Sequence, residues 1–281
     1  MLKKRPFGEW MTAFNGLCNV IVYFIIISSI LSSKKLRAIK TNHLVINLGI
    51  GHCIYGFVNA FGIWFDFKLS KIAYVGYIYA NVAIMMLTVD RCVMIRWPFR
   101  YETMHIGIHV LLVSISPLAA ALELTKAVMA GLQNNVVQDN SSMKVFIYGV
   151  SSIMVCLSIP NTLIFLTLQK QKAKLKLASQ EVVKSRKKQI LAFYVCFGCV
   201  ITYVLFWMSP LIIAILWSYT NVNVSYDYFS IGMAIANFNP VSDALIFVWF
   251  NKQLRKRVKE LFTTRNKLKC CIECKVSEEV I

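Results

Sequence analysis

Seven long apolar segments, each bounded by polar residues, constrain what this chain can fold into. A helix of about 20 apolar residues is long enough to cross the hydrocarbon layer of a bilayer. The chain is 57% hydrophobic and has a mean hydropathy of +0.59, whereas soluble domains are about 45–50% apolar. We therefore predict an all-α membrane protein that folds as a seven-transmembrane helix bundle.

The apolar segments also predict how the chain is divided. The seven expected membrane helices lie at residues 11–33, 42–65, 70–95, 106–130, 145–168, 190–217 and 228–250. The expected parts are a short extracellular N-terminus at 1–10, the bundle at 11–250, an amphipathic membrane-surface helix at 251–262 and a cytosolic tail at 263–281. No soluble domain, internal repeat or low-complexity segment is visible in the sequence, so we expect one helical domain.

The short helix expected after the last span has apolar residues at helical spacing, with basic residues between them. The apolar positions are Leu254, Val258, Leu261 and Phe262. This pattern is typical of an eighth helix that lies on a membrane surface. Cysteines next to such a helix are candidates for palmitoylation, and here they are Cys270, Cys271 and Cys274. The alternative for these cysteines is free thiols in the tail.

The distribution of basic residues predicts the orientation. Of the 31 Lys and Arg residues, 24 lie in segments that are inside if the C-terminus is cytosolic, and 6 lie in the outside segments. Cytosolic loops are enriched in Lys and Arg, so we expect the N-terminus outside. Basic loops also favour the anionic inner leaflet, so the net charge of +18 does not indicate nucleic acid. Two sequons in the expected outside loops make Asn140 and Asn223 glycosylation candidates.

An acid and a base stand side by side at the end of the third apolar segment. Asp90 and Arg91 follow the apolar run that begins after Asn81, and Pro98 is expected to end the helix shortly beyond them. Charges inside a membrane helix are costly, so this pair belongs at the cytosolic rim. A snorkelling Arg91 with a local counter-ion is the plain structural interpretation.

This stretch resembles the end of the third helix of rhodopsin-like G-protein-coupled receptors. The matching residues are Asp90, Arg91, Pro98, Phe99 and Tyr101. Further matches in the expected order and helices are Asn19, Leu48, Pro160, Pro210, Asn239 and Pro240. The resemblance covers nearly the whole chain, and the loop after the third helix is most similar to chemosensory and peptide-receptor branches.

The resemblance implies a function at the plasma membrane. A receptor of this family binds an extracellular ligand and activates a heterotrimeric G protein. Carried over, Arg91 is the partner-facing group and Asp90 is its lock. The other coupling and switch residues are Pro98, Phe99, Tyr101, Pro210, Asn239, Pro240 and Asp243. The physical device is a helical bundle with two states whose equilibrium is shifted by ligand.

The chain also departs from the family pattern. His52 stands where the family has an Asp in a sodium site, Asp243 replaces the Tyr of the seventh-helix motif, and Cys92 follows Arg91 in place of Tyr. One hypothesis is a network of His52, Asn239 and Asp243 in place of the sodium site. The alternative is separately satisfied side chains, as expected for the intramembrane Asn19. A receptor-fold protein that no longer couples is a second possible function.

The expected ligand pocket lies in the outer half of the bundle. Its candidate residues are Tyr74, Tyr77, Asn81, Met208, Trp217 and Phe229. Aromatic and Met side chains also pack helices together, so each residue has a structural alternative. Chemosensory, peptide and other small-molecule ligands all stay open.

Other classes of protein fit the sequence less well. Transporters commonly contain paired repeats and interrupted helices, and no similarity between halves is visible here. No His-Glu-x-x-His or Gly-x-Ser-x-Gly motif is present, so we do not expect an enzyme. Cys196 and Cys199 lie within an apolar segment and indicate packing, so we expect neither a metal nor a cofactor.

Overall fold

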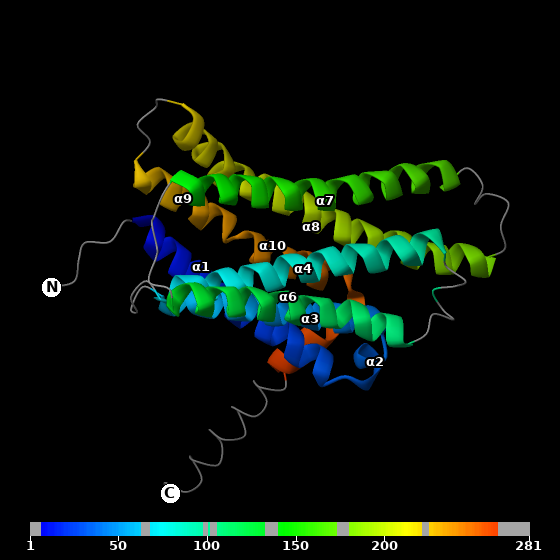
Figure 1. The fold of residues 1–281 in the computed structure, drawn as a ribbon. Coiled ribbons are helices and arrows are strands. Elements are labelled where there is room, and N and C mark those ends of the chain that lie inside the picture. Colours follow the sequence, from blue (N-terminus) through cyan, green and yellow to red (C-terminus); the bar gives the residue numbers. More distant parts are fainter. Residues whose placement is uncertain are drawn as a thin grey trace, which may run out of the picture.

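The computed structural model describes residues 7–62, 68–97, 101, 106–132, 140–172, 180–220 and 225–263. Every regular element in these ranges is a helix (Figure 1). The helices are α1 (Phe7–Leu31), α2 (Lys34–Arg37), α3 (Lys40–Phe61), α4 (Lys68–Arg96), α6 (Ile106–Leu132), α7 (Asn140–Lys172), α8 (Gln180–Tyr219), α9 (Tyr226–Ala236) and α10 (Asn239–Phe250).

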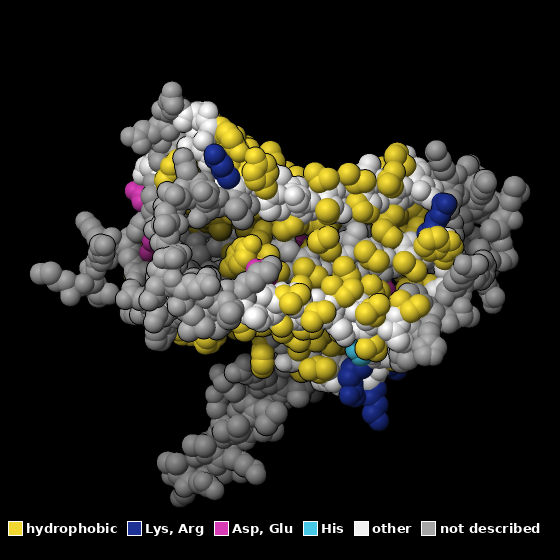
Figure 2. All heavy atoms as spheres, in the orientation of Figure 1, with side chains coloured by type: hydrophobic (Ala, Val, Ile, Leu, Met, Phe, Trp, Pro, Cys, Tyr) yellow, Lys and Arg dark blue, Asp and Glu magenta, His cyan; other side chains and the backbone are white. Residues whose placement is uncertain are grey.

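Seven helical segments of the described chain are long and apolar enough to cross a membrane. The segments are Phe7–Leu31, Lys40–Phe61, Tyr74–Arg96, Gly107–Thr125, Phe146–Gln169, Phe193–Tyr219 and Asp227–Phe250. Apolar side chains cover much of the middle of the face shown, and the Lys and Arg side chains drawn in blue lie nearer the ends (Figure 2). This distribution matches a bilayer around the middle of the bundle, so the all-α, multi-pass membrane architecture predicted from the sequence is confirmed.

The helices run back and forth along one bundle axis (Figure 1). α3 packs between α1 and α4, and α4 also contacts α6, α7 and α8. α8 packs against α7, α9 and α10, while α1 closes the bundle against α9 and α10. We call the end where α3 begins and α4 finishes the Asp90 end, and the end where α8 finishes and α9 begins the Trp217 end.

Several helices are longer than the apolar segments that predict them. α1 begins at Phe7 within the expected N-terminal segment, and α8 begins at Gln180, ten residues before the predicted start. The first ten residues of α8, Gln180–Gln189, are rich in Gln, Glu, Lys and Arg, which are good helix formers in water. The thickness of the membrane therefore sets the length of the apolar part of a helix, whereas polar residues can extend the helix beyond the membrane.

The last span is interrupted, although the sequence predicts one helix at 228–250. α9 ends before a turn at Asn237 and Phe238, and α10 begins at Asn239. Pro240 has no backbone N–H and cannot donate to a carbonyl one turn earlier. The Phe238 N–H bonds to the Ile235 carbonyl at 3.0 Å, so the Ala234 carbonyl lacks its usual helical donor.

Two asparagines of α1 hold this interruption. The Nδ2 group of Asn15 donates to the freed carbonyl of Ala234 at 2.8 Å. One turn further along α1, the Nδ2 group of Asn19 donates to the Asn237 carbonyl at 3.4 Å. Both side chains are fully buried. The intramembrane Asn19 therefore has a partner in the bundle, and Asn15 is a second such residue that the sequence analysis missed.

Glycines let α1 and α3 approach closely enough for these contacts. A Cβ atom built on Gly56 would lie 2.6 Å from the backbone oxygen of Gly16. This distance is shorter than real Cβ contacts, so both positions need a residue without a side chain. Small residues at such crossings are typical of packed membrane helices.

Residues 252–263, which follow α10, also have helical backbone. The Asn251 side-chain oxygen accepts a hydrogen bond from the Leu254 N–H at 3.1 Å and so caps this segment. Leu254 is buried, whereas Lys252 and Lys256 are exposed. Of the four predicted apolar positions, Leu254 is buried and Phe262 is 50% exposed, so the membrane-surface role of this segment stays a prediction.

Candidate functional site

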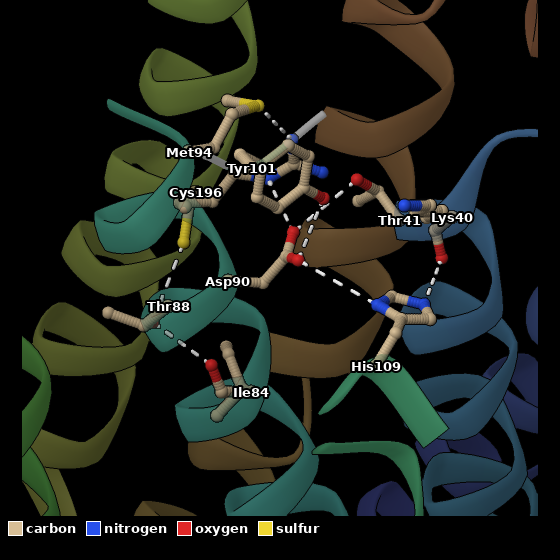
Figure 3. A network of polar contacts seen from close by, with 10 residues as sticks. Lys40, Thr41, Ile84, Thr88, Asp90, Met94, Tyr101, His109 and Cys196 are labelled. Carbon is tan, nitrogen blue, oxygen red and sulfur yellow. Dashed lines mark hydrogen bonds and ion pairs between the residues drawn. The ribbon is translucent and has the colours of Figure 1, made fainter. Parts of the chain in front are cut away.

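The buried carboxylate of Asp90 is the centre of the polar cluster at the Asp90 end (Figure 3). Only 1% of its surface is exposed. The Tyr101 hydroxyl donates to Oδ1 at 2.9 Å, and the Thr41 hydroxyl donates to Oδ2 at 3.4 Å. The Arg91 Nε lies 4.0 Å from Oδ2, and the His109 Nδ1 lies 4.0 Å from Oδ1. The carboxylate therefore joins groups from α3, α4, α6 and the segment after α4.

Arg91 is held beside this carboxylate with weak direct contacts. Besides the 4.0 Å pair with Asp90, its guanidinium Nη1 lies 3.5 Å from the sulfur of Met94. The side chain is 11% exposed. The guanidinium has five N–H donors, and a thioether sulfur is a weak acceptor. Arg91 therefore keeps donor capacity that a stronger acceptor can engage.

A crevice of about 460 Å³ opens at the Asp90 end, between α3, α4, α8 and α10. We call it the Arg91 crevice. Its polar and charged lining residues are Thr41, Asn42, Arg91, Asn251, Lys252 and Gln253. Its apolar wall includes Leu87, Val195, Phe247 and Phe250. Among these lining residues there are two cations and no carboxylate, so the crevice suits a partner with apolar and acceptor groups.

Tyr101 keeps its proton in this setting. Burial and the neighbouring charge of Asp90 together raise the pKa of the Tyr101 hydroxyl to about 12. A neutral phenol can donate to the carboxylate, whereas a phenolate would repel it. Tyr101 is therefore a hydrogen-bond donor to Asp90 at every physiological pH.

A second polar cluster lies in the interior of the bundle around Asp243. Asp243 is fully buried on α10. The Thr202 hydroxyl of α8 donates to its Oδ1 at 2.9 Å, and the Asn239 Nδ2 donates to its Oδ2 at 3.4 Å. Asp243 and Asn239 border a cavity of about 20 Å³, which also touches His52 and Asn81. Such a cavity holds about one water molecule.

His52 is the third residue of the network that the sequence suggested. Its ring stacks on Tyr23 with centroids 4.8 Å apart, and its Nδ1 has no hydrogen-bond partner among the described residues. The described contacts of Asp243 come from Thr202 and Asn239 instead. No direct contact between His52 and Asp243 is described, although His52, Asn239 and Asp243 border the same cavity. The three-residue network therefore stays a hypothesis.

Four ligand candidates belong to one row of touching aromatic rings toward the Trp217 end. In order, the row is Tyr74, Tyr77, Trp207, Phe146, Phe229 and Trp217. Adjacent ring centroids in the row are 5.0–6.3 Å apart. Such contacts are typical of stable aromatic packing. The row therefore links α4, α7, α8 and α9 across the bundle.

The six ligand candidates differ in their surroundings. Tyr77 and Asn81 border the interior cavity. Tyr74 is 50% exposed, Met208 is 40% exposed and Trp217 is 36% exposed. Phe229 packs edge-to-face on Trp217 with ring centroids 6.2 Å apart. The structure thus separates an inner pair at the cavity from a group nearer the Trp217 end.

Pro210 has a local replacement for its missing hydrogen bond. The Ser209 hydroxyl donates to the Phe206 carbonyl at 3.3 Å, which Pro210 leaves without its helical donor. The same hydroxyl lies 3.5 Å from the Gly232 carbonyl of α9. Ser209 therefore joins α8 to the helix whose end is interrupted before Asn239 and Pro240.

Some predicted site residues lie outside the described residues, and others were missed. Pro98, Phe99, Asn223, Cys270, Cys271 and Cys274 are not described, and Asn140 is described in its backbone only, at the start of α7. The contacting residues that sequence reasoning missed are Thr41, His109, Thr202, Asn15 and Phe146. Their only signal in the sequence is a polar or aromatic residue in an apolar segment, which does not identify a partner.

No family model matches this sequence, and no curated protein matches it. The fold and the apolar surface define a multi-pass helical membrane protein. The function is therefore argued from the sites themselves.

Proposed function

We propose that the protein is a divergent rhodopsin-like G-protein-coupled receptor, which binds an extracellular ligand and activates a heterotrimeric G protein. The observation that carries this proposal is the position of Arg91. It lies beside the buried Asp90 and lines a crevice of about 460 Å³. A lone snorkelling arginine needs neither a buried carboxylate nor an apolar crevice, so the arrangement favours the receptor function.

The proposed orientation places the Asp90 end in the cytosol of a cell whose plasma membrane the protein spans. The segments that the sequence predicts to be cytosolic hold 24 of the 31 Lys and Arg residues. Cytosolic loops carry such an excess. Residues 252–263 then lie on the anionic inner leaflet with their basic side, and the cysteines that follow them in the sequence, Cys270, Cys271 and Cys274, are candidates for palmitoylation.

In the proposed mechanism, Asp90 holds Arg91 in the resting state, and a G protein binds the Arg91 side chain in the active state. Asp90 also accepts hydrogen bonds from Tyr101 and Thr41, which position its carboxylate beside Arg91 in the resting state. The apolar wall of the Arg91 crevice accepts the partner. The helices that move are those with interrupted hydrogen bonding, namely α8 at Pro210 and the α9–α10 break before Asn239 and Pro240.

The proposed ligand site lies at the Trp217 end, which faces outward in this orientation. The row of aromatic rings connects Trp217 and Phe229 with Trp207 and Tyr77. Tyr77 also borders the cavity next to Asp243. A ligand that displaces the outer rings can therefore act on the interior cluster. A chemosensory compound, a peptide or another small molecule fits this proposal.

A second function is a receptor-fold protein that does not couple. The favouring observation is Asp243, which is fully buried and bonded to Thr202 of α8 and Asn239 of α10. This link holds α8 and α10 together and opposes their separation. A transporter is less favoured, because the seven spans show no pairing into similar halves.

Nucleotide exchange on purified G proteins tests the function. The protein is purified into lipid nanodiscs, and exchange is measured for a panel of heterotrimeric G proteins without ligand. We expect wild type to accelerate exchange for at least one G protein, and Asp90→Asn to accelerate it further because Arg91 is released. Arg91→Ala should return exchange to the rate without receptor.

Arg96→Ala is the matched control for Arg91→Ala. Arg96 is an exposed arginine in the last turn of the same helix, and its loss should leave exchange unchanged. If neither wild type nor Asp90→Asn accelerates exchange on any G protein, the non-coupling alternative is supported. Exchange that persists in Arg91→Ala would exclude the proposed role of Arg91.

A further inference from the structure

His109 of α6 connects two other helices at the Asp90 end (Figure 3). Its Nε2 lies 2.7 Å from the backbone oxygen of Lys40 in α3, and its Nδ1 lies 4.0 Å from Oδ1 of Asp90 in α4. The side chain is 12% exposed. The two ring nitrogens therefore face two different acceptors in a mostly buried position.

The Lys40 carbonyl determines which nitrogen carries the proton. A carbonyl oxygen can only accept a hydrogen bond, so Nε2 must be the donor in the 2.7 Å contact. A neutral imidazole has one N–H, and its other nitrogen then has a lone pair. In neutral His109 this lone pair belongs to Nδ1, which faces the Asp90 carboxylate. Neither atom can donate to the other, which agrees with their separation of 4.0 Å.

A second proton on His109 converts the contact between its Nδ1 and the Asp90 carboxylate from two facing acceptors into an ion pair. With Nδ1 protonated, the imidazolium donates to Asp90, and charge-assisted bonds of this kind are about 2.7–2.9 Å long. The positive charge also repels the guanidinium of Arg91, which is held by the same carboxylate at 4.0 Å. Protonation of His109 and retention of Arg91 by Asp90 therefore oppose each other.

Among the residues that the structure describes, the other charged and titratable groups near His109 do not provide this response. On α3 they are Lys40 and His43, and on α4 they are Asp90 and Arg91. Tyr101 stays neutral at physiological pH, because burial and Asp90 raise its pKa to about 12. The His43 ring is exposed, and its centroid lies 6.1 Å from that of His109, so a charge there opposes protonation of His109.

We propose that His109 is a proton-binding site that regulates the Asp90–Arg91 pair, so that acidification at the Asp90 end releases Arg91. The inference that His109 binds a proton rests only on the geometry of His109, Lys40 and Asp90. The inference that this proton regulates G-protein activation rests on the proposed function, since released Arg91 is the group that a G protein engages. In the proposed orientation the sensed compartment is the cytosol. Histidine is suited to this role because its ordinary titration falls near physiological pH.

The proton site is tested without any G protein. Protein with isotope-labelled His and Asp is reconstituted in lipid and studied by nuclear magnetic resonance, with the His109 signals identified by their loss in His109→Gln. We expect a neutral ring with the proton on Nε2 at pH 8 and a doubly protonated ring at pH 6. The distance from Nδ1 to the Asp90 carboxyl carbon should shorten at pH 6. A neutral ring with the proton on Nδ1 at pH 8, or no second proton at pH 6, overturns the proposal.

The regulatory output is tested by receptor-stimulated nucleotide exchange between pH 8 and pH 6, relative to Arg91→Ala at each pH. We expect exchange by wild type to rise roughly threefold on acidification, because the positive charge on His109 pairs with Asp90 and repels Arg91. His109→Gln keeps a donor for the Lys40 carbonyl but does not titrate, so its exchange should be independent of pH. His43→Gln is the matched control and should keep the response of wild type.

The two experiments separate the proton site from the proposed function. If His109 takes up the proton and shortens its distance to Asp90, but no variant stimulates exchange at any pH, the proposed function fails and the proton site stands. If exchange is stimulated and its pH dependence is the same in His109→Gln, the regulation by His109 is refuted and the proposed function stands.

Discussion

Asn47 of α3 replaces the hydrogen bond that Pro117 removes from α6. Its Nδ2 donates to the Val113 carbonyl at 3.0 Å. In a regular helix this carbonyl accepts from the N–H of residue 117, which proline lacks. The Tyr79 hydroxyl of α4 donates to the Asn47 side-chain oxygen. One buried asparagine therefore links α3, α4 and α6 where a carbonyl would otherwise be unsatisfied inside the membrane.

We predict that Asn47→Ala lowers the free energy of unfolding by about 1–2 kcal/mol, because a buried carbonyl loses its donor. Pro117→Ala restores an N–H for the Val113 carbonyl. Asn47→Ala should therefore cost less than half as much in the Pro117→Ala background. Reversible unfolding in mixed micelles measures all four proteins of this double-mutant cycle. Equal costs of Asn47→Ala in both backgrounds would show that Asn47 does not act through Val113.

The close approach of α1 and α3 gives a prediction about Gly56. Gly56→Ala places a Cβ atom 2.6 Å from the Gly16 backbone oxygen, so the helices must separate. We expect a loss of roughly 1–3 kcal/mol in the free energy of unfolding, as in other overpacked interiors. Gly149→Ala is the control, since a Cβ atom there meets nothing within 4 Å. This control should be neutral or stabilising because Ala favours helix over Gly.

The number and place of the spans could be predicted from the sequence because they depend on local composition. A run of apolar residues is costly to leave in water, and its length decides whether it crosses a bilayer. The pairing of Asp90 with Arg91 was also predictable, since the two are neighbours in the chain. The interruption of the last span at Asn237 could not be predicted, because a proline such as Pro240 weakens a helix without determining where its hydrogen bonding stops. The asparagines of α1 determine that position.

The other contacts of the candidate site depend on positions far apart in the chain. Thr41 reaches Asp90 from α3, and His109 reaches it from α6. Neither residue has a sequence pattern that identifies this partner, since a Thr or His at the end of a span is also satisfied by water. The surroundings of His52 also depend on distant positions. The sequence shows that His52 needs a neighbour, but only the packing of α1 places Tyr23 there.

The interior cavity leads to a prediction about sodium. It has a volume of about 20 Å³, which is enough for about one water molecule and leaves no room for the several waters that would complete the coordination of a sodium ion. The Asp243 carboxylate is already engaged by Thr202 and Asn239. We expect the same thermal midpoint in sodium chloride and in potassium chloride at equal ionic strength. Clear stabilisation by sodium that is lost in Asp243→Asn would contradict this prediction.

Tyr101 is expected to hold the resting state through its hydrogen bond to Asp90. Tyr101→Phe removes the 2.9 Å bond and leaves the ring in place. Hydrogen bonds to charged groups contribute about 1.5–3 kcal/mol, so the balance between states should shift toward release of Arg91. If the proposed function holds, we expect ligand-free nucleotide exchange to rise roughly fivefold or more.

Two comparisons make the Tyr101 experiment specific. Tyr194→Phe changes an exposed tyrosine of α8 and should leave exchange at the rate of wild type. Thr41→Val removes the longer bond of 3.4 Å to the same carboxylate, so its effect should have the same direction and a smaller size. Arg91→Ala added to Tyr101→Phe should abolish the increase, because the released guanidinium is the group that acts. An increase that survives in this double variant would mean that Tyr101 restrains the bundle by a route that does not pass through Arg91.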